Sequence, residues 1–218
     1  EDEIPQIIES IHNRYFDRTE APGYRALDRV LEAIVDRRQD DLQCAGVTVE
    51  QRTMLLDIMR RFLRVPTTLV RCFPIHEYDS KDHGLRVRSM LNTEDESHLS
   101  WRKKFEGFLD FLVDRCSSVE REAYLEAAAR TQTGGIRVDA REVGDDLNEE
   151  EAVVTLANVQ VAMGVTKREK RSRLMRAFNT PFFPDILVCS RVMGEGVDLQ
   201  RYCRHVIHHD LAWNPSEI

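Results

Sequence analysis

The sequence feature that most constrains the fold is a pair of short apolar runs near the C-terminal end of the chain. The runs Ile186–Cys189 and His205–His208 have the length and the β-branched content of buried parallel strands. A polar loop containing Gly194 and Gly196 lies between them. Because open α/β sheets bind ligands at the carboxyl ends of their strands, we expect this loop to place Asp198 in a ligand-binding crevice.

A strand, a turn and a basic helix are predicted just before the first of these runs. Residues 152–163 are rich in β-branched side chains and should contain a strand, although their first half could instead finish a helix. Gly164–Thr166 forms a turn into a helix over Lys167–Phe178, which carries six basic residues against the single acid Glu169. Its apolar residues are expected to face the sheet.

The segment Leu187–Gln200, Leu-Val-Cys-Ser-Arg-Val-Met-Gly-Glu-Gly-Val-Asp-Leu-Gln, resembles motif V of the second RecA-like lobe of superfamily-two helicases and DNA translocases. The strand, turn and basic helix before it fit the same pattern, as do the apolar run and the turn Asp210–Pro215, Asp-Leu-Ala-Trp-Asn-Pro, after it. The likeness is greatest to the bacterial members of the SWI/SNF-like branch. The chain ends at Ile218, where the arginine-bearing motif VI helix should begin, so we interpret it as a fragment of a longer polypeptide.

The resemblance implies specific roles for residues of motif V, which in this family lies in the cleft between the two lobes. The residues that it assigns to catalysis are Glu195, Gly196 and Asp198, and those near the nucleotide are Gly194, Gly196, Asp198 and Gln200. The residues of motif V assigned to the nucleic-acid backbone are Ser190 and Arg191. Independently of the resemblance, the charge of the basic helix suggests phosphate contacts through Lys167, Arg168, Arg171 and Arg173. Two simpler readings stay open: a glycine-rich turn with a capping Asp needs no ligand, and a run of charges can be a solvated helix face.

Two features of the family are missing from this sequence. The motif IV strand that normally opens the second lobe is not recognisable, and Ile136–Val138 is the nearest segment. The phosphate-binding loop and the magnesium-binding carboxylates are also absent, and in this family they belong to the first lobe. We therefore expect ATP and Mg²⁺ to act in the full-length parent, with the first RecA-like lobe as partner, and the fragment alone to be inactive and to bind neither firmly.

The first 130 residues are predicted to be mainly helical. Apolar periodicity indicates helices over residues 4–16, 24–38 and 101–115, and an alanine-rich helix over residues 120–130. Thr48 is a good N-cap, with Gln51 in the capping-box position of a further helix that ends or kinks at Pro66. Residues 75–100 show no sustained period and are expected to form a loop. The predicted domains are a helical region at 1–130, an acidic linker at 131–151 and a truncated α/β lobe at 152–218.

The composition limits the class of partner and the cellular compartment. The formal net charge of −7 argues against binding nucleic acid by bulk electrostatics but allows a local basic strip. Five cysteines without paired spacing and the lack of a signal peptide favour the cytoplasm, and no window is apolar enough for a membrane span. We expect the nucleic acid to be DNA rather than RNA. The alternative function is a nonenzymatic helical protein-interaction module with a small α/β domain.

The C-terminal segment also contains residues that could suggest a metal site. Cys203, His205, His208 and His209 are residue types that bind zinc. In a strand, however, His208 points away from His205 and His209, so the set cannot converge on one ion. We therefore assign no metal ligands.

Overall fold

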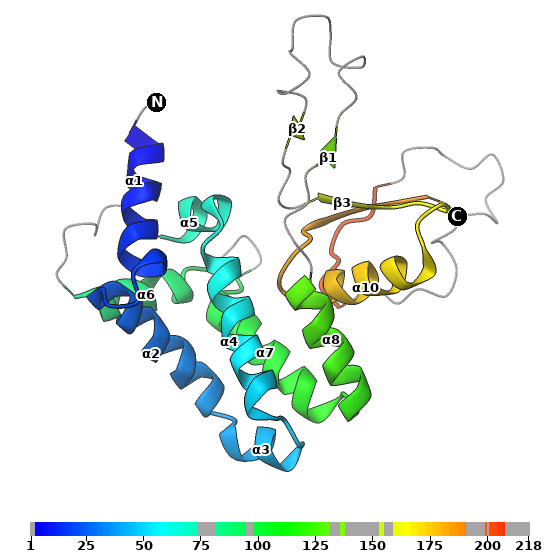
Figure 1. The fold of residues 1–218 in the computed structure, drawn as a ribbon, viewed down its shortest axis with the longest axis horizontal. Coiled ribbons are helices and arrows are strands. Elements are labelled where there is room, and N and C mark those ends of the chain that lie inside the picture. Colours follow the sequence, from blue (N-terminus) through cyan, green and yellow to red (C-terminus); the bar gives the residue numbers. More distant parts are fainter. Residues whose placement is uncertain are drawn as a thin grey trace, which may run out of the picture.

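The protein combines a mainly helical region with a small parallel sheet that is flanked by one helix (Figure 1). The computed structural model describes residues 3–73, 82–94, 98–130, 136–137, 153–154, 159–190, 199 and 201–207. This architecture is a partial α/β lobe preceded by a helical region, which confirms the fold class predicted from the sequence.

The helical region is an assembly of short helices. In chain order these are α1 (Glu3–His12), the π-helical turn η1 (Asn13–Asp17), α2 (Pro22–Asp36), α3 (Gln39–Cys44), α4 (Val49–Leu63), α5 (Pro66–Cys72), α6 (His83–Asn92), α7 (Trp101–Asp114) and α8 (Ser118–Arg130). Their apolar faces meet in one core that extends from α1 to α8.

The predicted start and end of α4 are confirmed. The Thr48 side chain accepts a hydrogen bond from the Gln51 backbone N–H at 3.2 Å, and the Gln51 side chain accepts one from the Thr48 N–H at 3.3 Å. The helix ends at Leu63, because Pro66 cannot continue its hydrogen bonds. Pro66 instead occupies the first turn of α5, where its missing N–H costs nothing.

The prediction of a loop over residues 75–100 is wrong, because this stretch contains helix α6. The Asp82 side chain caps the helix by accepting a hydrogen bond from the Leu85 N–H at 2.9 Å. Val87, Met90 and Leu91 are buried, at exposed fractions of 1% or less. The helix has fewer than three turns, and the long polar side chain of Arg86 is also buried, so the apolar period was too short and too interrupted to recognise.

Two arginines, Arg121 of α8 and Arg61 of α4, hold α8 against the other helices. Arg121, only 4% exposed, donates hydrogen bonds to the carbonyl oxygens of Leu112 at 3.0 Å, Cys116 at 3.2 Å and Ala45 at 2.7 Å. These bonds satisfy carbonyl groups at the ends of α7 and α3 that their own helices leave unpaired. The start of α8 is thereby fixed in position.

The other end of α8 is held from α4. Arg61 donates to the carbonyl oxygens of Ala128 and Ala129 at 2.8 and 2.6 Å. An arginine at a helix C-terminus satisfies free carbonyl groups and complements the negative end of the helix dipole. Burial lowers the pKa of Arg61, which the charge of Asp57 partly offsets, and the side chain stays cationic because its pKa begins far above neutrality.

A tyrosine–histidine pair joins η1 to α6, and it makes stability depend on pH. The Tyr15 hydroxyl and the Nδ1 atom of His83 share a hydrogen bond at 2.8 Å, and the two rings meet edge to face. Burial, with the nearby charges of Arg14 and Arg86, lowers the pKa of His83 below 6.5, and Asp82 opposes this shift. Below pH 6.5 the unfolded chain therefore takes up a proton that the folded chain resists.

We expect the free energy of unfolding to fall as the pH drops below about 6.5, and His83→Gln to reduce that fall. The contribution of His83 should be fully present above this pH, because the imidazole is then neutral in both states. Urea unfolding at a series of pH values checks this, with His98→Gln as the control because that histidine is exposed. A pH profile of His83→Gln identical to that of the unsubstituted chain would contradict it.

The C-terminal part contains two small sheets. Strands β1 (Ile136–Arg137) and β2 (Val153–Val154) pair antiparallel. Strands β3 (Val159–Ala162) and β4 (Ile186–Cys189) pair in parallel, with Val159 opposite Ile186 and Ala162 opposite Cys189. Helix α10 (Arg168–Phe178) connects β3 to β4, as a parallel pair requires.

Several predictions for this part are confirmed. The strand expected within residues 152–163 is β3, the basic helix is α10, and Ile186–Cys189 is β4. Leu174 and Ala177 of α10 are buried, and Leu174 packs with Ala162 and Leu187 of the sheet. The β3–α10–β4 unit is therefore the one indicated by the hydrophobic pattern.

The predicted partner of β4 was wrong. Residues 205–207 form neither strand nor helix, and the described neighbour of β4 is β3. Val206 and Ile207 are 74% and 91% exposed, so this apolar run is not buried against the described sheet. β4 is also less buried than expected, since Ile186 is 54% exposed. The motif IV candidate at Ile136 pairs with β2 and does not extend the β3–β4 sheet.

The segment between α10 and β4 packs into the core of the helical region, while the β3–α10–β4 unit has a small apolar cluster of its own. After α10 the chain enters the helical region, where Phe182 and Phe183 are 4% and 7% exposed. Phe182 packs against Phe105 and Phe108 of α7, at ring-centroid distances of 5.7 and 5.4 Å. Phe182 and Phe183 both pack against Phe62 of α4.

Among the described residues, no helix is both long and apolar enough to cross a membrane.

Candidate functional site

The candidate site begins at the carboxyl edge of the β3–β4 sheet. The Ser190 N–H donates to the Ala162 carbonyl oxygen at 3.2 Å, which extends the ladder one step beyond β4. Ser190 is thus placed where parallel strands end and where ligands usually bind. Its hydroxyl oxygen is buried and has no hydrogen-bond partner within the described part of the chain. A buried polar atom of this kind is a candidate for pairing with another group.

Most of the motif V segment lies outside the described residues, namely positions 191–198 and 200. The predicted site residues among them are Arg191, Gly194, Glu195, Gly196, Asp198 and Gln200. Their roles stay predictions, whereas Ser190 is fixed at the edge from which this segment departs.

A turn at the same edge directs the chain from β3 into the basic helix. The Met163 N–H donates to the Thr166 hydroxyl at 3.0 Å, and the Thr166 N–H donates to the Met163 carbonyl at 3.0 Å. This reciprocal pair closes the turn predicted at Gly164–Thr166. Helix α10 therefore starts at the edge that carries Ser190, and Arg168 and Lys170 lie in its first turn together with Glu169.

The four predicted basic residues do not lie on one face of α10. Lys167 and Arg168 are exposed at the start of the helix, and Arg171 and Arg173 are half-buried. Arg168 and Arg173 line a groove between α10 and α8, and Lys167 and Arg171 are not among the residues that line it. Arg176 and Arg130 line the same groove, and the sequence-based prediction missed both.

The helical region contacts the chain on both sides of the motif V segment. Phe182 and Phe183 enter its core before β4, and the Arg201 guanidinium lies 3.3 Å from the centroid of the Phe111 ring in α7 after it. Such a cation–π contact contributes about 0.5–1 kcal/mol at an exposed site. Burial raises the pKa of Tyr202, next to Arg201. The described ends of the segment are therefore held by the same helices.

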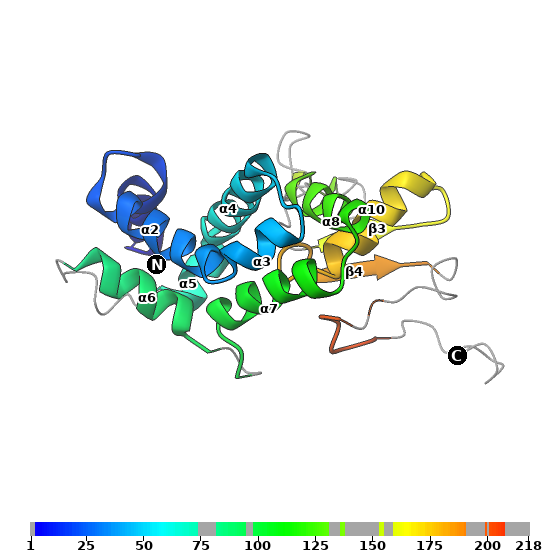
Figure 2. The same ribbon diagram turned by 90° about the horizontal axis from the view of Figure 1, so that it is seen from below.

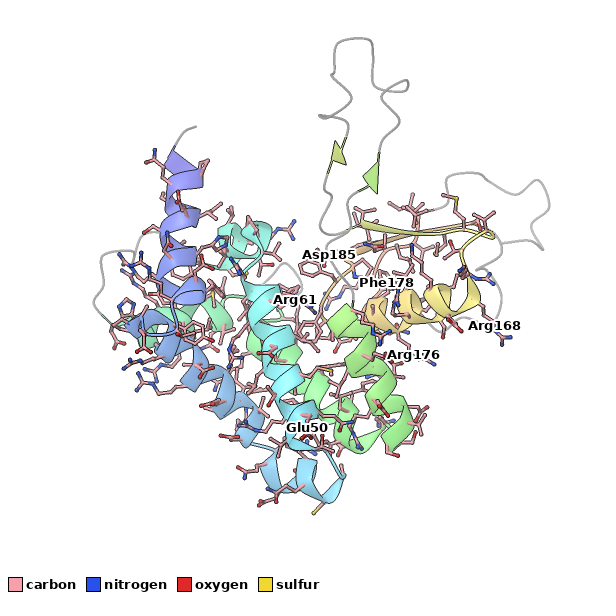
Figure 3. The ribbon with its side chains drawn as sticks, viewed as in Figure 1. Glu50, Arg61, Arg168, Arg176, Phe178 and Asp185 are labelled. Carbon is pink, nitrogen blue, oxygen red and sulfur yellow. The ribbon has the colours of Figure 1, made fainter. Side chains whose placement is uncertain are left out.

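Asp185, at the start of β4, is a further titratable group that sequence reasoning did not identify (Figure 3). The residue as a whole is exposed, but its carboxyl group is partly removed from water, which raises its pKa. The charges of Arg71 in α5 and Lys104 in α7 lower that pKa by smaller amounts. Asp185 lies at the opposite end of β4 from Ser190, so we assign it no part in the candidate site.

The cysteine and histidine that suggested zinc do not form a cluster in the described part of the chain. The Cys203 thiol donates to the carbonyl oxygen of His205 at 3.5 Å, and the imidazole is not part of that contact. Within the described ranges no group of three or more histidine, cysteine or acidic residues could hold a metal ion. His208 and His209 lie outside those ranges.

The C-terminal part of the chain, which contains the candidate site, is similar to a known protein family. Residues 127–218 match the family model of the helicase conserved C-terminal domain. The match begins near the end of α8 and includes the β3–α10–β4 unit and the motif V segment. It supports a helicase C-terminal lobe in this region. No curated protein and no solved structure matches the chain.

Proposed function

We propose that this chain supplies the second lobe of an ATP-dependent DNA helicase or translocase, with its motif V segment at the cleft between two lobes. The observation that carries the proposal is the match of residues 127–218 to the helicase C-terminal family, over a parallel strand–helix–strand unit. Ser190, at the end of β4, belongs to the segment that resembles motif V. Within these helicases and translocases, the proposal places the chain in the SWI/SNF-like branch.

The roles proposed for the individual residues follow from the resemblance to motif V. ATP and Mg²⁺, bound mainly by the first lobe, supply the chemical free energy. Asp198 and Glu195 would organise the nucleotide side of the cleft, and Gly194 and Gly196 would allow close backbone approach. Alternate closing and opening of the two lobes would then let the backbone contacts of each lobe advance along a strand.

The start of α10 is the proposed contact with the nucleic-acid backbone. Lys167 and Arg168 are exposed there, and the helix begins at the same sheet edge as the motif V segment. Cations that pair with phosphates release counterions from the nucleic acid, so each contact adds salt-dependent affinity. This local basic strip is compatible with the overall charge of −7.

Reversing two charges on α10 tests the contact. We expect Arg168→Glu with Arg171→Glu to lower DNA affinity near 0.1 M salt, by about tenfold for each phosphate that the helix no longer pairs with. For each such phosphate, the slope of log affinity against log salt should become shallower by about 0.7 for single strands and about 0.9 for duplex. Fluorescence anisotropy of a labelled oligonucleotide, titrated at several salt concentrations, measures both quantities.

The matched control reverses two exposed arginines of α2, Arg25→Glu with Arg29→Glu. It changes the net charge of the chain by the same amount on a helix that lies far from α10 (Figure 1). Equal losses in both double variants would show that only net charge matters. If the unsubstituted chain bound no DNA at low salt, the nonenzymatic interaction module would be the better description.

A further inference from the structure

A basic groove lies between α8 of the helical region and α10 of the C-terminal lobe. Its volume is about 410 Å³. The two helices lie side by side, as Figures 1 and 2 show. The α8 side of the groove is formed by Ala123, Glu126, Ala127 and Arg130, and the α10 side by Arg168, Glu169, Ser172, Arg173 and Arg176.

The spacing of these residues explains why a groove forms here. On each helix they recur at intervals of three and four residues, so each set lies on one helix face. On α8, Ala123 and Ala127 have short side chains and alternate along this face with the charged residues Glu126 and Arg130. The long side chains of α10 therefore form one wall, and the short ones of α8 form a floor.

The charge in the groove is positive although the protein is acidic. Four arginines line it, against the two carboxylates Glu126 and Glu169. Arg130 pairs with Glu126 at 2.6 Å, and their side chains are 62% and 49% exposed. An exposed pair of this kind is worth at most about 1 kcal/mol, so Arg130 can exchange its partner for a phosphate at little cost.

The groove is long enough for more than one phosphate. Arg168 and Arg176 lie at opposite ends of α10 (Figure 3). Eight residues separate them, which is about 12 Å along the helix axis. Since phosphates of one strand of a duplex repeat about every 3.4 Å along its axis, several can lie between the two arginines. The Ser172 hydroxyl, between them, is a further hydrogen-bond donor.

We propose that this groove holds the phosphate backbone of a DNA strand, and that the helical region takes part in DNA binding through Arg130. The inference rests on the proposed function and extends it, since it adds Arg130 and Arg176 to the DNA-binding surface. Phosphate contacts fix the register and orientation of a strand without reading its sequence. The strand would therefore bind to both parts of the chain at once.

Two substitutions on α8 with opposite expected effects test the proposal. Arg130→Gln should weaken DNA binding about fivefold to tenfold near 0.1 M salt and make the salt slope shallower by about 0.7 to 0.9. Glu126→Gln should strengthen binding by about twofold to fivefold, because it removes a carboxylate that repels phosphate and competes for Arg130. Arg130→Lys should restore most of the affinity, since it restores the charge.

Arg25→Gln is the matched control for Arg130→Gln. Arg25 is 61% exposed and pairs with Glu20 at 2.6 Å, so it matches Arg130 in exposure and in ion-pair distance. It belongs to α2, outside the groove, and its substitution should leave the affinity within about twofold. Thermal unfolding of each variant shows whether the fold is kept.

Binding is measured by anisotropy with a labelled DNA oligonucleotide, as single strand and as duplex. Weaker binding of Arg130→Gln with unchanged binding of Arg25→Gln would support the groove. If Arg130→Gln bound as tightly as the unsubstituted chain while the α10 reversal weakened binding, the groove proposal would be wrong and the proposed function would stand. If neither substitution on α8 nor the reversal on α10 affected DNA binding, both the groove proposal and the proposed function would be wrong.

Discussion

Replacing Phe182 with alanine is expected to lower the free energy of unfolding by about 3–5 kcal/mol. The side chain is 4% exposed and packs against three phenylalanines, Phe62, Phe105 and Phe108. Truncation removes the apolar area that the ring buries and leaves a cavity that the neighbouring rings cannot fill without moving. Because Phe182 joins the lobe to the helical core, the substitution should also weaken the packing between the two parts.

Urea unfolding followed by far-ultraviolet circular dichroism measures this change in stability. Phe178→Ala is the control, because Phe178 is a half-buried residue of the same type four positions earlier. It should cost about 1–2 kcal/mol, since less apolar area leaves water there. Equal losses for the two variants, or a loss below about 1 kcal/mol for Phe182→Ala, would mean that Phe182 does not pack in this core.

The elements with long, regular apolar periods could be predicted from the sequence. Helix α4 was found from its capping box and its apolar face, and α10 from its basic run and the Gly164–Thr166 turn. Helix α6 was missed because its buried face is short and includes Arg86. A polar residue in the core breaks the period on which the prediction depends.

Strand pairing was harder to predict than the strands themselves. Each of the runs at 186–189 and 205–207 has the composition of a buried strand, but composition does not say which strands are neighbours. The observed partner of β4 is β3, which lies before α10 in the chain, and this is the right arrangement for a strand–helix–strand unit. The run at 205–207 is exposed instead.

The positions of some candidate-site residues could be predicted. Ser190 lies at the expected sheet edge, and Arg168 and Arg173 lie together in a groove. Arg130 was missed, because it belongs to a helix that the sequence assigned to another domain and that only the packing brings to α10. The sequence did contain one signal for Arg130, because its spacing places it on the same face of α8 as Ala123 and Ala127.

The second large effect is expected at Asp198. In a polypeptide that joins this chain to the proposed first lobe, Asp198→Asn should lower the DNA-stimulated rate of ATP hydrolysis about 100-fold. The substitution keeps the size of the side chain and removes its charge, so in the proposed role it would disturb the positioning of groups in the hydrolysis step. DNA affinity should stay within about twofold, because the proposed phosphate contacts belong to α10 and α8.

The control for Asp198→Asn is the reversal of Arg168 and Arg171 in the same polypeptide. That variant should lose DNA affinity and should reach a near-normal hydrolysis rate once DNA is saturating. The two variants thus separate binding from hydrolysis, because each changes one of the two quantities.

The most direct test of the second-lobe assignment is the steady-state ATPase rate of Asp198→Asn at saturating DNA, measured beside its salt-titrated DNA affinity. We predict a rate about 100-fold below that of the unsubstituted protein, with DNA affinity preserved. An unchanged rate, or equal losses of rate and affinity, would contradict the role of the motif V segment in ATP hydrolysis and leave it as a structural loop.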